Sequence, residues 1–562
     1  HDVIGVDINE ESIEITKLSL FLKMARKNRK LTDLSNHVKQ GNSLIDDETV
    51  DTETAFDWDK EFPFKFDIVI GNPPYVRVQN LTHAEIDWYK ANKKTAFKRV
   101  DISIMFMELA NTLLKPKGIL GYITSNQFIV TEYGKNLRKF ILDKYRIKKI
   151  IDFGALPIFY GASTYVSIFI FENNTKKNFK YIKINNMTEA QHITNVNEIN
   201  IDISSLNDEA WKLINKNELI LMNRLSLITN LKDIGNAWTG LITGMDEVLM
   251  FDESRIKELN FEKEAILPII RGTDPKRYSY CRPSKYVIYP YTTNKDKTVV
   301  LSEADLKNKY PCVYNYLLQN KNVLINRKDS RKTFANRKDW YSLVRFGQKN
   351  VFNKFKIVSP GEVKNHKFAI DTSKAGFSCA RVFAITLKNE DYDIKYVLTI
   401  LNSKLIKFYL RQIAPLKQGG FYTYSSAILN KVPLMDLSRT QQKPFIQKAD
   451  HMLKLNKELS ELRNAFIKRL EGNYNLHKTT KKLEKFYELD ENMFLKELQK
   501  ITKTKLSLDQ QDTLAKFFNK YKNKITEIRT KIGQIDKEID PMVYNLYRLT
   551  PEEIKIVEKS LK

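Results

Sequence analysis

The feature that most constrains this chain is a short apolar segment that ends in two consecutive prolines. Residues 66–70 indicate a buried strand of a parallel sheet, because they are almost uninterrupted in hydrophobicity and rich in β-branched side chains. Gly71 ends that strand, and Pro73 and Pro74 then prevent both a continued ladder and a helix. An amide, a free carbonyl and the ring of Tyr75 are therefore expected at the carboxyl edge of a sheet, where open α/β folds place their ligands.

These groups suit one chemical task, which is to receive an exocyclic amino group. The side-chain oxygen of Asn72 and the carbonyl of Pro73 can each accept one N–H of a planar NH2 group, which draws the nitrogen lone pair out of conjugation and makes it nucleophilic. Tyr75 can stack on the ring that carries the amine. A proline-rich tight turn without a ligand is the alternative interpretation of the same residues.

The segment Asn72-Pro73-Pro74-Tyr75 after a strand resembles the catalytic motif of amino-group DNA methyltransferases, in particular the N6-adenine enzymes of the TaqI type. The order of elements across residues 1–175 is similar to the same family. The resemblance implies a Rossmann-like methyltransferase sheet, S-adenosylmethionine as methyl donor and an adenine that has left the double helix. It implies catalytic roles for the four motif residues, and no metal ion is expected.

Polar residues follow two upstream segments that have the pattern of strands. Residues 1–8 reach Asp7 and Ile8, which are the candidates for cofactor binding because an acid at this point of nucleotide-binding folds accepts hydrogen bonds from ribose. A helix N-cap is the alternative role for Asp7. Asn42 follows the next strand, where the family usually has an aspartate that binds the cofactor's adenine. The helix between these strands is expected to reach about Arg29, with an apolar side made of Ile13, Leu18, Phe21 and Leu22.

The chain is expected to lack the first part of this domain. Residues 1–8 already have the pattern of a strand interior to a domain, and no glycine-rich cofactor loop precedes Asp7. We therefore expect a chain cut upstream, with its first strand, its glycine loop and any nuclease domain outside residues 1–562.

Two segments around the catalytic strand have weaker patterns. Residues 46–61 are acidic and are expected to form a solvated loop, and residues 76–100 are expected to form a lid or an ordinary loop.

In TaqI-type enzymes an aromatic residue just before the last strand faces the motif tyrosine across the flipped base. Phe159 matches that position best and Tyr160 is the reserve, whereas a core phenylalanine at a strand entrance is the alternative.

The charge balance favours a polyanionic partner. Lys and Arg number 93 against 67 Asp and Glu, which gives a net charge of +26. A solvated basic surface is the plain explanation, but an excess this large in a folded enzyme favours double-stranded DNA. The cysteines are single and scattered, which predicts neither a zinc site nor disulfides and fits a reducing cytoplasm. No apolar run approaches a membrane span, and we expect a monomer.

A change of character after residue 235 predicts a target-recognition domain. Residues 176–235 are polar and Asn-rich, as in a linker, whereas residues 236–440 combine short β-rich runs with tyrosines and neighbouring basic residues. Residues 400–406 and 419–425 resemble the TaqI-like specificity domain, which reads the target sequence in that family. Three arginines in short polar turns beside a Tyr or Trp are the hypothetical base readers: Arg271, Arg277 and Arg345.

Residues 441–562 carry apolar side chains at helical spacing, which predicts a helical hairpin or bundle. The predicted fold class is therefore α/β: an N-terminally truncated Rossmann-like methyltransferase sheet, then a mixed α+β DNA-recognition domain and a C-terminal helical region. With 562 residues the chain is long enough for two or three domains.

The leading functional hypothesis is a site-specific N6-adenine DNA methyltransferase of a restriction-modification system. TaqI-like methyltransferase and specificity halves are often fused behind a nuclease, so a fragment of a type IIG restriction endonuclease-methyltransferase is the second hypothesis. Residues 1–562 contain no convincing nuclease motif, and the nearest pattern is at residues 57–60. A protein-glutamine methyltransferase uses the same motif on an amide, but the basic 236–440 region argues against it. A DNA-binding remnant without activity is a further alternative.

Overall fold

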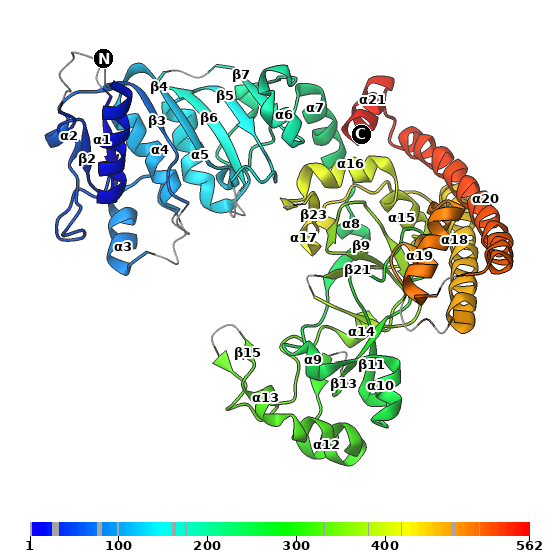
Figure 1. Ribbon diagram of the computed structural model, residues 1–562. Helices are drawn as coiled ribbons and strands as arrows, with labels where there is room; N and C mark the ends of the chain where they lie inside the picture. The colour runs from blue at the N-terminus through cyan, green and yellow to red at the C-terminus, as the bar shows by residue number, and fades with distance from the viewer. Residues whose placement is uncertain are drawn as a thin grey trace. The chain divides into compact units, whose positions relative to one another are not determined.

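The computed structural model describes residues 3–24, 33–75, 81–97, 101–159, 165–174, 177–295, 297–329, 332–379, 381–417, 419–474, 476, 479–504 and 506–561. The chain divides into two compact units, residues 1–219 and residues 220–562 (Figure 1). Sheets occur in both units and long helices at the end of the second, which confirms the predicted mixed α/β class with a C-terminal helical region. The finer division into four segments stays a prediction.

The first unit is built on a six-stranded sheet. Its strands run in the order β3(Phe66–Gly71), β4(Leu114–Ser125), β6(Val166–Glu172), β5(Arg146–Asp152), β7(Phe179–Lys183) and β8(Ile199–Ile201). β3 pairs in parallel with β4, and β5 pairs in parallel with β7, whereas β6 is antiparallel to both β4 and β5. β3, which the Asn72-Pro73-Pro74-Tyr75 motif follows, and its neighbour β4 therefore end at the same edge of the sheet.

Two helices cover this sheet with apolar side chains. α4(Ile102–Leu113) begins at Asp101, whose carboxylate accepts the backbone N–H of Ser103, and α5(Lys135–Lys144) follows β4 (Figure 1). Met107 and Ala110 of α4 are fully buried against Leu120 of β4 in the main core of the unit. This packing fixes the strands whose ends carry the motif.

Other short elements of the first unit lie in the connections between its strands. They are the α-helices α2(Trp58–Glu61), α3(His83–Asn92) and α6(Met187–Gln191) and the short 3-10 helices η2(Gln127–Ile129), η3(Glu132–Gly134), η4(Ile193–Asn195) and η5(Ile203–Ser205). α7(Lys216–Ser226) follows at the division between the units.

The first two strands form a separate pair. β1(Gly5–Asp7) pairs in parallel with β2(Val38–Gln40), and among the described residues neither joins the six-stranded sheet. In the helix between them, α1(Glu10–Met24), only Ile13 of the predicted apolar side is buried, whereas Leu18 and Leu22 are 59% and 71% exposed. The predicted buried side was therefore wrong, because no described element covers it. The expected end near Arg29 lies outside the described residues.

β3 is an edge strand and not the buried strand that the sequence predicted. Ile68 and Ile70, two residues apart and thus on one face, are 65% and 83% exposed. Val69 points to the other face and packs against the main core of the unit. An apolar run without alternation suggested burial on both faces, but here the second face of β3 has no cover among the described residues.

The acidic segment at residues 46–61 is ordered, which the sequence did not predict. Phe56 and Phe62 are each 5% exposed and pack edge-to-face or tilted with Trp58. Asp51 accepts hydrogen bonds from the Asn42 amide and the Thr54 hydroxyl. The acidic residues thus cap turns over an aromatic cluster, and a solvated loop is the wrong description of the segment.

The second unit contains two four-stranded sheets and three smaller ones. One four-stranded sheet has the order β19(Ala369–Asp371), β17(Lys356–Pro360), β21(Val382–Leu387) and β9(Gly235–Thr239). The other has the order β10(Met250–Phe251), β12(Lys285–Ile288), β11(Ile266–Ile270) and β20(Gly376–Phe377). The smaller sheets are β18(Glu362–Val363) with β23(Phe421–Thr423) and β22(Leu416–Lys417), β13(Tyr291–Asn294) with β14(Lys297–Val300), and β15(Lys328–Asp329) with β16(Lys332–Thr333).

Short helices connect these strands. They are α8(Leu231–Ile234), α9(Asp246–Leu249), α10(Glu253–Glu258), η6(Lys263–Ala265), α11(Glu303–Lys309), α12(Pro311–Gln319), α13(Lys321–Ile325), α14(Lys349–Phe352), α15(Ile394–Leu401), α16(Lys404–Ile413) and α17(Ser426–Leu429). Buried side chains of α9, η6, α11, α12, α13 and α14 share one core with both four-stranded sheets, so this part of the unit is a mixed α+β arrangement.

Two long helices end the chain as an extended pair. α18(Arg439–Tyr474) and α20(Leu508–Leu546) run side by side, with η7(Leu483–Glu488), α19(Glu491–Thr502) and α21(Pro551–Ser560) around them (Figure 1). Aromatic rings form the core between the two helices: Phe466 stacks on Phe486, and Phe518 packs edge-to-face against Phe486. The predicted helical region is confirmed.

One fully buried ion pair joins two strands of the second unit. The Nζ atom of Lys356 lies 2.6 Å from Oδ2 of Asp371, and both side chains have an exposed fraction of 0%. Lys356 also donates to the carbonyls of Phe352 and Lys354, and Asp371 also accepts from Ser373. Burial lowers the pKa of Lys356 and the carboxylate of Asp371 opposes that effect. Each charge is therefore compensated by several hydrogen bonds.

Loss of one partner should destabilise the second unit strongly. Lys356→Met leaves the Asp371 carboxylate buried without a cation, and we expect the free energy of unfolding to fall by about 3–5 kcal/mol. Lys356→Met combined with Asp371→Leu removes both charges and should cost much less. Hydrogen exchange of the β17 amides measures this difference, and equal losses in the single and double variants would contradict the explanation.

Candidate active site

The motif lies at the carboxyl end of β3, beside the neighbouring strand. Gly71 pairs with Tyr122 of β4, and a Cβ atom at Gly71 would lie 3.1 Å from the Tyr122 ring. Tyr122 is itself buried, with 5% of its surface exposed, so it has little room to move. Any side chain at position 71 would therefore crowd the Tyr122 ring, so glycine suits the strand end from which Asn72 begins the loop.

Asn72 and Tyr75 contact each other within the loop. The phenol O–H of Tyr75 donates to Oδ1 of Asn72 at 2.9 Å and lies 3.4 Å from the carbonyl oxygen of Ile123. Asn72 and Pro74 are exposed, Pro73 is buried and Tyr75 is half-buried. Burial raises the pKa of Tyr75, so its phenol stays protonated and remains a donor near neutral pH.

The structure brings Phe159 to this loop from a distant part of the sequence. The centroids of the Tyr75 and Phe159 rings are 6.3 Å apart, with an angle of 48° between their planes. Both rings are half-buried and pack at the margin of a small apolar cluster that includes Ile123. Tyr160, the reserve candidate, lies outside the described residues. Two aromatic rings, an amide and a proline carbonyl therefore meet at one edge of the sheet.

A carboxylate at the end of β5 organises the strand ends beside the motif. Oδ1 of Asp152 accepts hydrogen bonds from the Asn126 amide at 2.7 Å and the backbone N–H of Gly154 at 2.9 Å. The Ser167 hydroxyl donates to the same oxygen at 3.0 Å, and the Tyr181 phenol donates to Oδ2 at 2.8 Å. Burial, and then the Asp152 charge, raise the pKa of Tyr181 well above its ordinary value. Asp152 thereby fixes the start of the loop that carries Phe159.

Sequence reasoning did not identify this network. An acid that ends a strand was considered at Asp7, and the same signal is present at Asp152, which ends β5. Its partners come from three other elements, so their proximity depends on the order of strands in the sheet. Only the fold brings them together.

The predicted cofactor residues lie on the β1–β2 pair. Asp7 and Ile8 are exposed, and Oδ1 of Asp7 accepts the backbone N–H of Asn9 at 2.8 Å. The N-cap of α1 is Asn9, whose side chain accepts from Ser12, so Asp7 keeps a second carboxylate oxygen for a ligand hydroxyl. The Asn42 side chain already has two hydrogen-bond partners. Its N–H donates to the Asp51 carboxylate at 2.8 Å, and its oxygen accepts from the backbone N–H of Leu44 at 3.1 Å.

The three arginines proposed as base readers differ in their surroundings. Arg271 is half-buried and its Nη1 lies 3.6 Å from Oδ2 of Asp246, whereas Arg345 is exposed on a strand-like bridge to Ile242. Arg277 lies 2.5 Å from Oδ2 of Asp536 in α20 and donates to the carbonyl of Asn402 at 2.9 Å. A base contact by Arg277 would have to break this pairing, whereas Arg345 is accessible without rearrangement.

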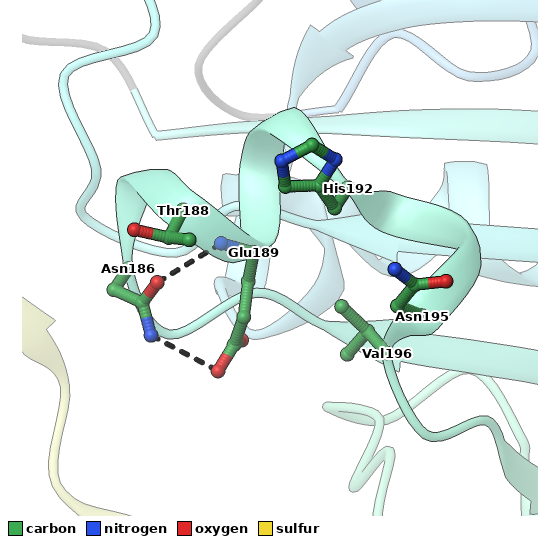
Figure 2. Close-up of a pocket in the computed structure, with 6 residues that line it drawn as sticks. All are labelled: Asn186, Thr188, Glu189, His192, Asn195 and Val196. Atoms are coloured by element: carbon green, nitrogen blue, oxygen red, sulfur yellow. Dashed lines mark hydrogen bonds between the residues drawn. The ribbon is translucent and has the colours of Figure 1, made fainter.

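A surface pocket of about 520 Å³ lies elsewhere on the first unit, over α6 and η4. Figure 2 shows that its Asn186 and Glu189 side chains bond within the turn, where Asn186 accepts from the Glu189 backbone at 2.9 Å and donates to its carboxylate at 3.0 Å. These are helix-capping contacts and offer little to a ligand. No residue of the candidate active site lines this pocket.

The described part of the chain has neither a metal-binding cluster nor a membrane-spanning helix. It contains no group of three His, Cys, Asp or Glu residues that could hold a metal ion. It also contains no helix that is long and apolar enough to cross a bilayer.

Family models match three segments of the chain. Residues 1–159 match the Eco57I restriction-modification methylase, and residues 267–434 match the TaqI-like C-terminal specificity domain. The predicted resemblance to restriction-modification methyltransferases is confirmed. Residues 438–543, which span most of the long helical pair, match a domain of unknown function (DUF8810).

Individual relatives agree with these matches. The type II restriction enzyme and methyltransferase RM.Eco57I of Escherichia coli is 25% identical over 456 residues, which are 74% of this chain and 45% of that relative. The type II methyltransferase M.BstVI of Geobacillus stearothermophilus is 26% identical over 395 residues, which are 66% of this chain and 68% of that relative. The chain thus spans less than half the length of the first of these proteins.

One solved structure resembles the fold over most of the chain. The type IIL restriction-modification enzyme MmeI, solved in complex with DNA, has a TM-score of 0.56 and 12% sequence identity. The match covers 93% of this chain and 66% of that structure. At this identity the likeness extends to the fold alone.

The Arg277–Asp536 contact leads to a stability prediction. Arg277→Ala removes a charge-assisted contact between the specificity region and α20, so we expect the free energy of unfolding to fall by about 2 kcal/mol. Asp536→Ala should have a similar effect, and the double variant should lose little more than either single variant. Urea denaturation measures these losses. If Arg277→Ala left stability unchanged and altered only the preferred DNA sequence, its role would be base contact instead.

Proposed function

We propose that this chain is the methyltransferase and specificity part of an N6-adenine DNA methyltransferase of a restriction-modification system. The observation that carries the proposal is the meeting of Asn72, Pro73, Tyr75 and Phe159 at the carboxyl edge of β3. The family matches at residues 1–159 and 267–434 support a methylase joined to a DNA-reading domain.

In this proposal the two rings receive a flipped adenine. Tyr75 and Phe159 contact each other in the present structure, so the base enters as the Tyr75 side chain turns away from Asn72. The freed oxygen of Asn72 and the carbonyl of Pro73 then accept the two N–H groups of the adenine amine. The nitrogen lone pair leaves conjugation with the ring and points out of its plane. S-adenosylmethionine supplies the methyl group when it is bound.

The residues present fit part of a cofactor site. Asp7 offers an exposed carboxylate at the end of β1, which suits ribose hydroxyls. Asn42 fits an adenine edge only if its amide releases Asp51. In a Rossmann-like fold β1 and β3 would also belong to the same sheet, whereas here β1 pairs with β2 in a separate two-stranded sheet. We propose that a strand and glycine loop from a preceding segment pair with the open edge of β3 and complete both the sheet and the cofactor site.

Substitutions in the motif should separate chemistry from DNA binding. Asn72→Ala removes the acceptor for the target amine, and we expect turnover to fall by at least about a hundredfold while affinity for duplex DNA stays near normal. Tyr75→Ala should act in the same way through lost stacking. The measurement is methyl transfer to a DNA library, read by sequencing of modified adenines, with this chain extended by the proposed strand and glycine loop.

Tyr75→Phe is the matched control for this experiment. It keeps the ring and removes only the hydroxyl, which in the present structure contacts Asn72. We expect it to retain most of the activity, because stacking and not the hydroxyl serves the bound base. Near-normal turnover of Asn72→Ala, or modification of cytosine in place of adenine, would overturn the assignment.

Cofactor binding should depend on the proposed preceding strand. Residues 1–562 alone should bind S-adenosylmethionine weakly, because backbone contacts to its methionine part come from the strand and glycine loop that we propose. Calorimetry on this chain and on one extended upstream tests the idea, with Asp7→Ala in the extended chain as a control that should also lose affinity. Tight binding by residues 1–562 would place the cofactor site elsewhere.

A bifunctional enzyme is the second candidate. The relative RM.Eco57I is named both a restriction enzyme and a methyltransferase, and this chain covers 45% of it. A nuclease in the protein to which this chain belongs would be tested by cleavage of unmodified DNA, with Asn72→Ala as the variant that keeps cleavage and loses protection. Protein-glutamine methylation is disfavoured by the match to a specificity domain at residues 267–434.

A further inference from the structure

A small sheet of the second unit presents an aromatic side chain to solvent at a glycine turn. β23 pairs with β22 on one side and with β18 on the other, both antiparallel. Gly419 and Gly420 precede β23 with φ angles of +79° and +77°, a backbone region that other residues adopt at a cost. These two glycines allow the chain to reverse tightly and leave Phe421 as the first residue of the returning strand.

The two faces of this sheet differ in character. Successive residues of a strand point to opposite faces, so Phe421 and Tyr422 lie on opposite sides. Tyr422 is paired with Val363, which is 2% exposed, and therefore lies on the inner face. Phe421 lies on the outer face with 37% of its surface exposed, so part of its ring is accessible to a partner.

Cations flank Phe421 on this outer face. The Nζ atom of Lys364 lies 4.9 Å from the centroid of the Phe421 ring. Lys417 is the cross-strand partner of Phe421 and forms an exposed ion pair of 2.5 Å with Glu362. An exposed pair of this kind contributes little to stability and is easily exchanged for another anion. An exposed ring thus lies between two lysines that reach solvent.

Helix α16 adds positive charge beside the sheet. Its Arg411 lies 5.4 Å from the centroid of the Tyr422 ring, on the inner face opposite Phe421, and Lys407 lies one turn earlier on the same helix; β23 is drawn beside α16 in Figure 1. Within the described residues neither side chain has a carboxylate oxygen within 4.0 Å, and the same is true of Lys364. Burial and then the Arg411 charge lower the pKa of Lys407.

We propose that the outer face of the β18–β23–β22 sheet is a DNA contact in which the Phe421 ring packs against a base and Lys364 and Lys417 contact the flanking phosphates. Proteins that bind DNA in this way insert apolar side chains between base steps and neutralise the DNA phosphates with nearby cations, and an exposed ring flanked by lysines fits that pattern. The cations without acidic partners and the net charge of +26 favour a polyanion over a protein partner. This inference rests on the proposed DNA-methyltransferase function and adds a contact to it.

The test measures binding of the full chain to a random-sequence duplex by fluorescence anisotropy between about 50 and 200 mM salt. Phe421→Ala should weaken binding about tenfold, as expected for one lost base contact, and leave the salt dependence unchanged. Phe421→Trp should restore affinity because it keeps an aromatic face. Lys364→Gln with Lys417→Gln should reduce the slope of log affinity against log salt by about 1.8, which is about 0.9 for each lost phosphate contact.

Two matched controls come from the same unit. Phe355→Ala removes an aromatic ring that is 61% exposed, and Lys307→Ala removes one exposed positive charge from α11; neither should change affinity appreciably. Phe421→Ala binding like Phe355→Ala, or an unchanged slope in the double lysine variant, would overturn the inference while leaving the proposed function intact. Failure of the unmodified chain to bind any duplex would instead overturn the proposed function.

Discussion

The close parallel approach of β3 and β4 is the constraint on which the candidate site depends. The parallel register pairs Gly71 with Tyr122, whose buried ring would be crowded by a side chain at position 71, and this register fixes where the two strands end relative to each other. Asn72 then starts the loop, and the phenol of Tyr75 lies 3.4 Å from the carbonyl oxygen of Ile123, the residue of β4 that follows the segment paired with β3. Two prolines keep this short loop extended, so the amide, the carbonyl and the ring are positioned mainly by the backbone.

The same strand that positions the motif is incomplete on its other side. Ile68 and Ile70 expose one face of β3, and Leu18 and Leu22 expose one side of α1. Aliphatic groups exposed in this number on neighbouring elements of one unit are unfavourable in water, which is why they indicate a surface that another element covers. Covering the exposed face of β3 requires an element packed against that face, whereas a further strand at the free edge of β3 would extend the sheet in its own plane.

Local signals in the sequence predicted which residues lie together at the motif better than they predicted contacts between distant segments. The strand, the turn and the aromatic partner Phe159 could be predicted because each depends on a few neighbouring residues or on a family resemblance. The exposure of α1 could not, because an apolar helical pattern does not say whether the covering element is present. The pairing of Arg277 with Asp536 joins residues far apart in the chain, so an arginine in a polar turn looked like a free base reader. The Asp152 network was missed for the same reason.

In the second unit, the distinction between paired and unpaired cations is more informative than the total charge. Lys356 is buried against Asp371, Arg277 lies against Asp536, and Lys404 lies between Asp540 and Glu558, so these cations hold strands and helices together. A cation held in this way would have to give up a desolvated partner before it could bind a phosphate, which is unfavourable. In the proposed function, DNA affinity would therefore come from cations that the fold leaves at the surface. On the outer face of the β18–β23–β22 sheet, Lys364 lies 4.9 Å from the centroid of the exposed Phe421 ring, so a surface cation and an aromatic ring are available at the same place.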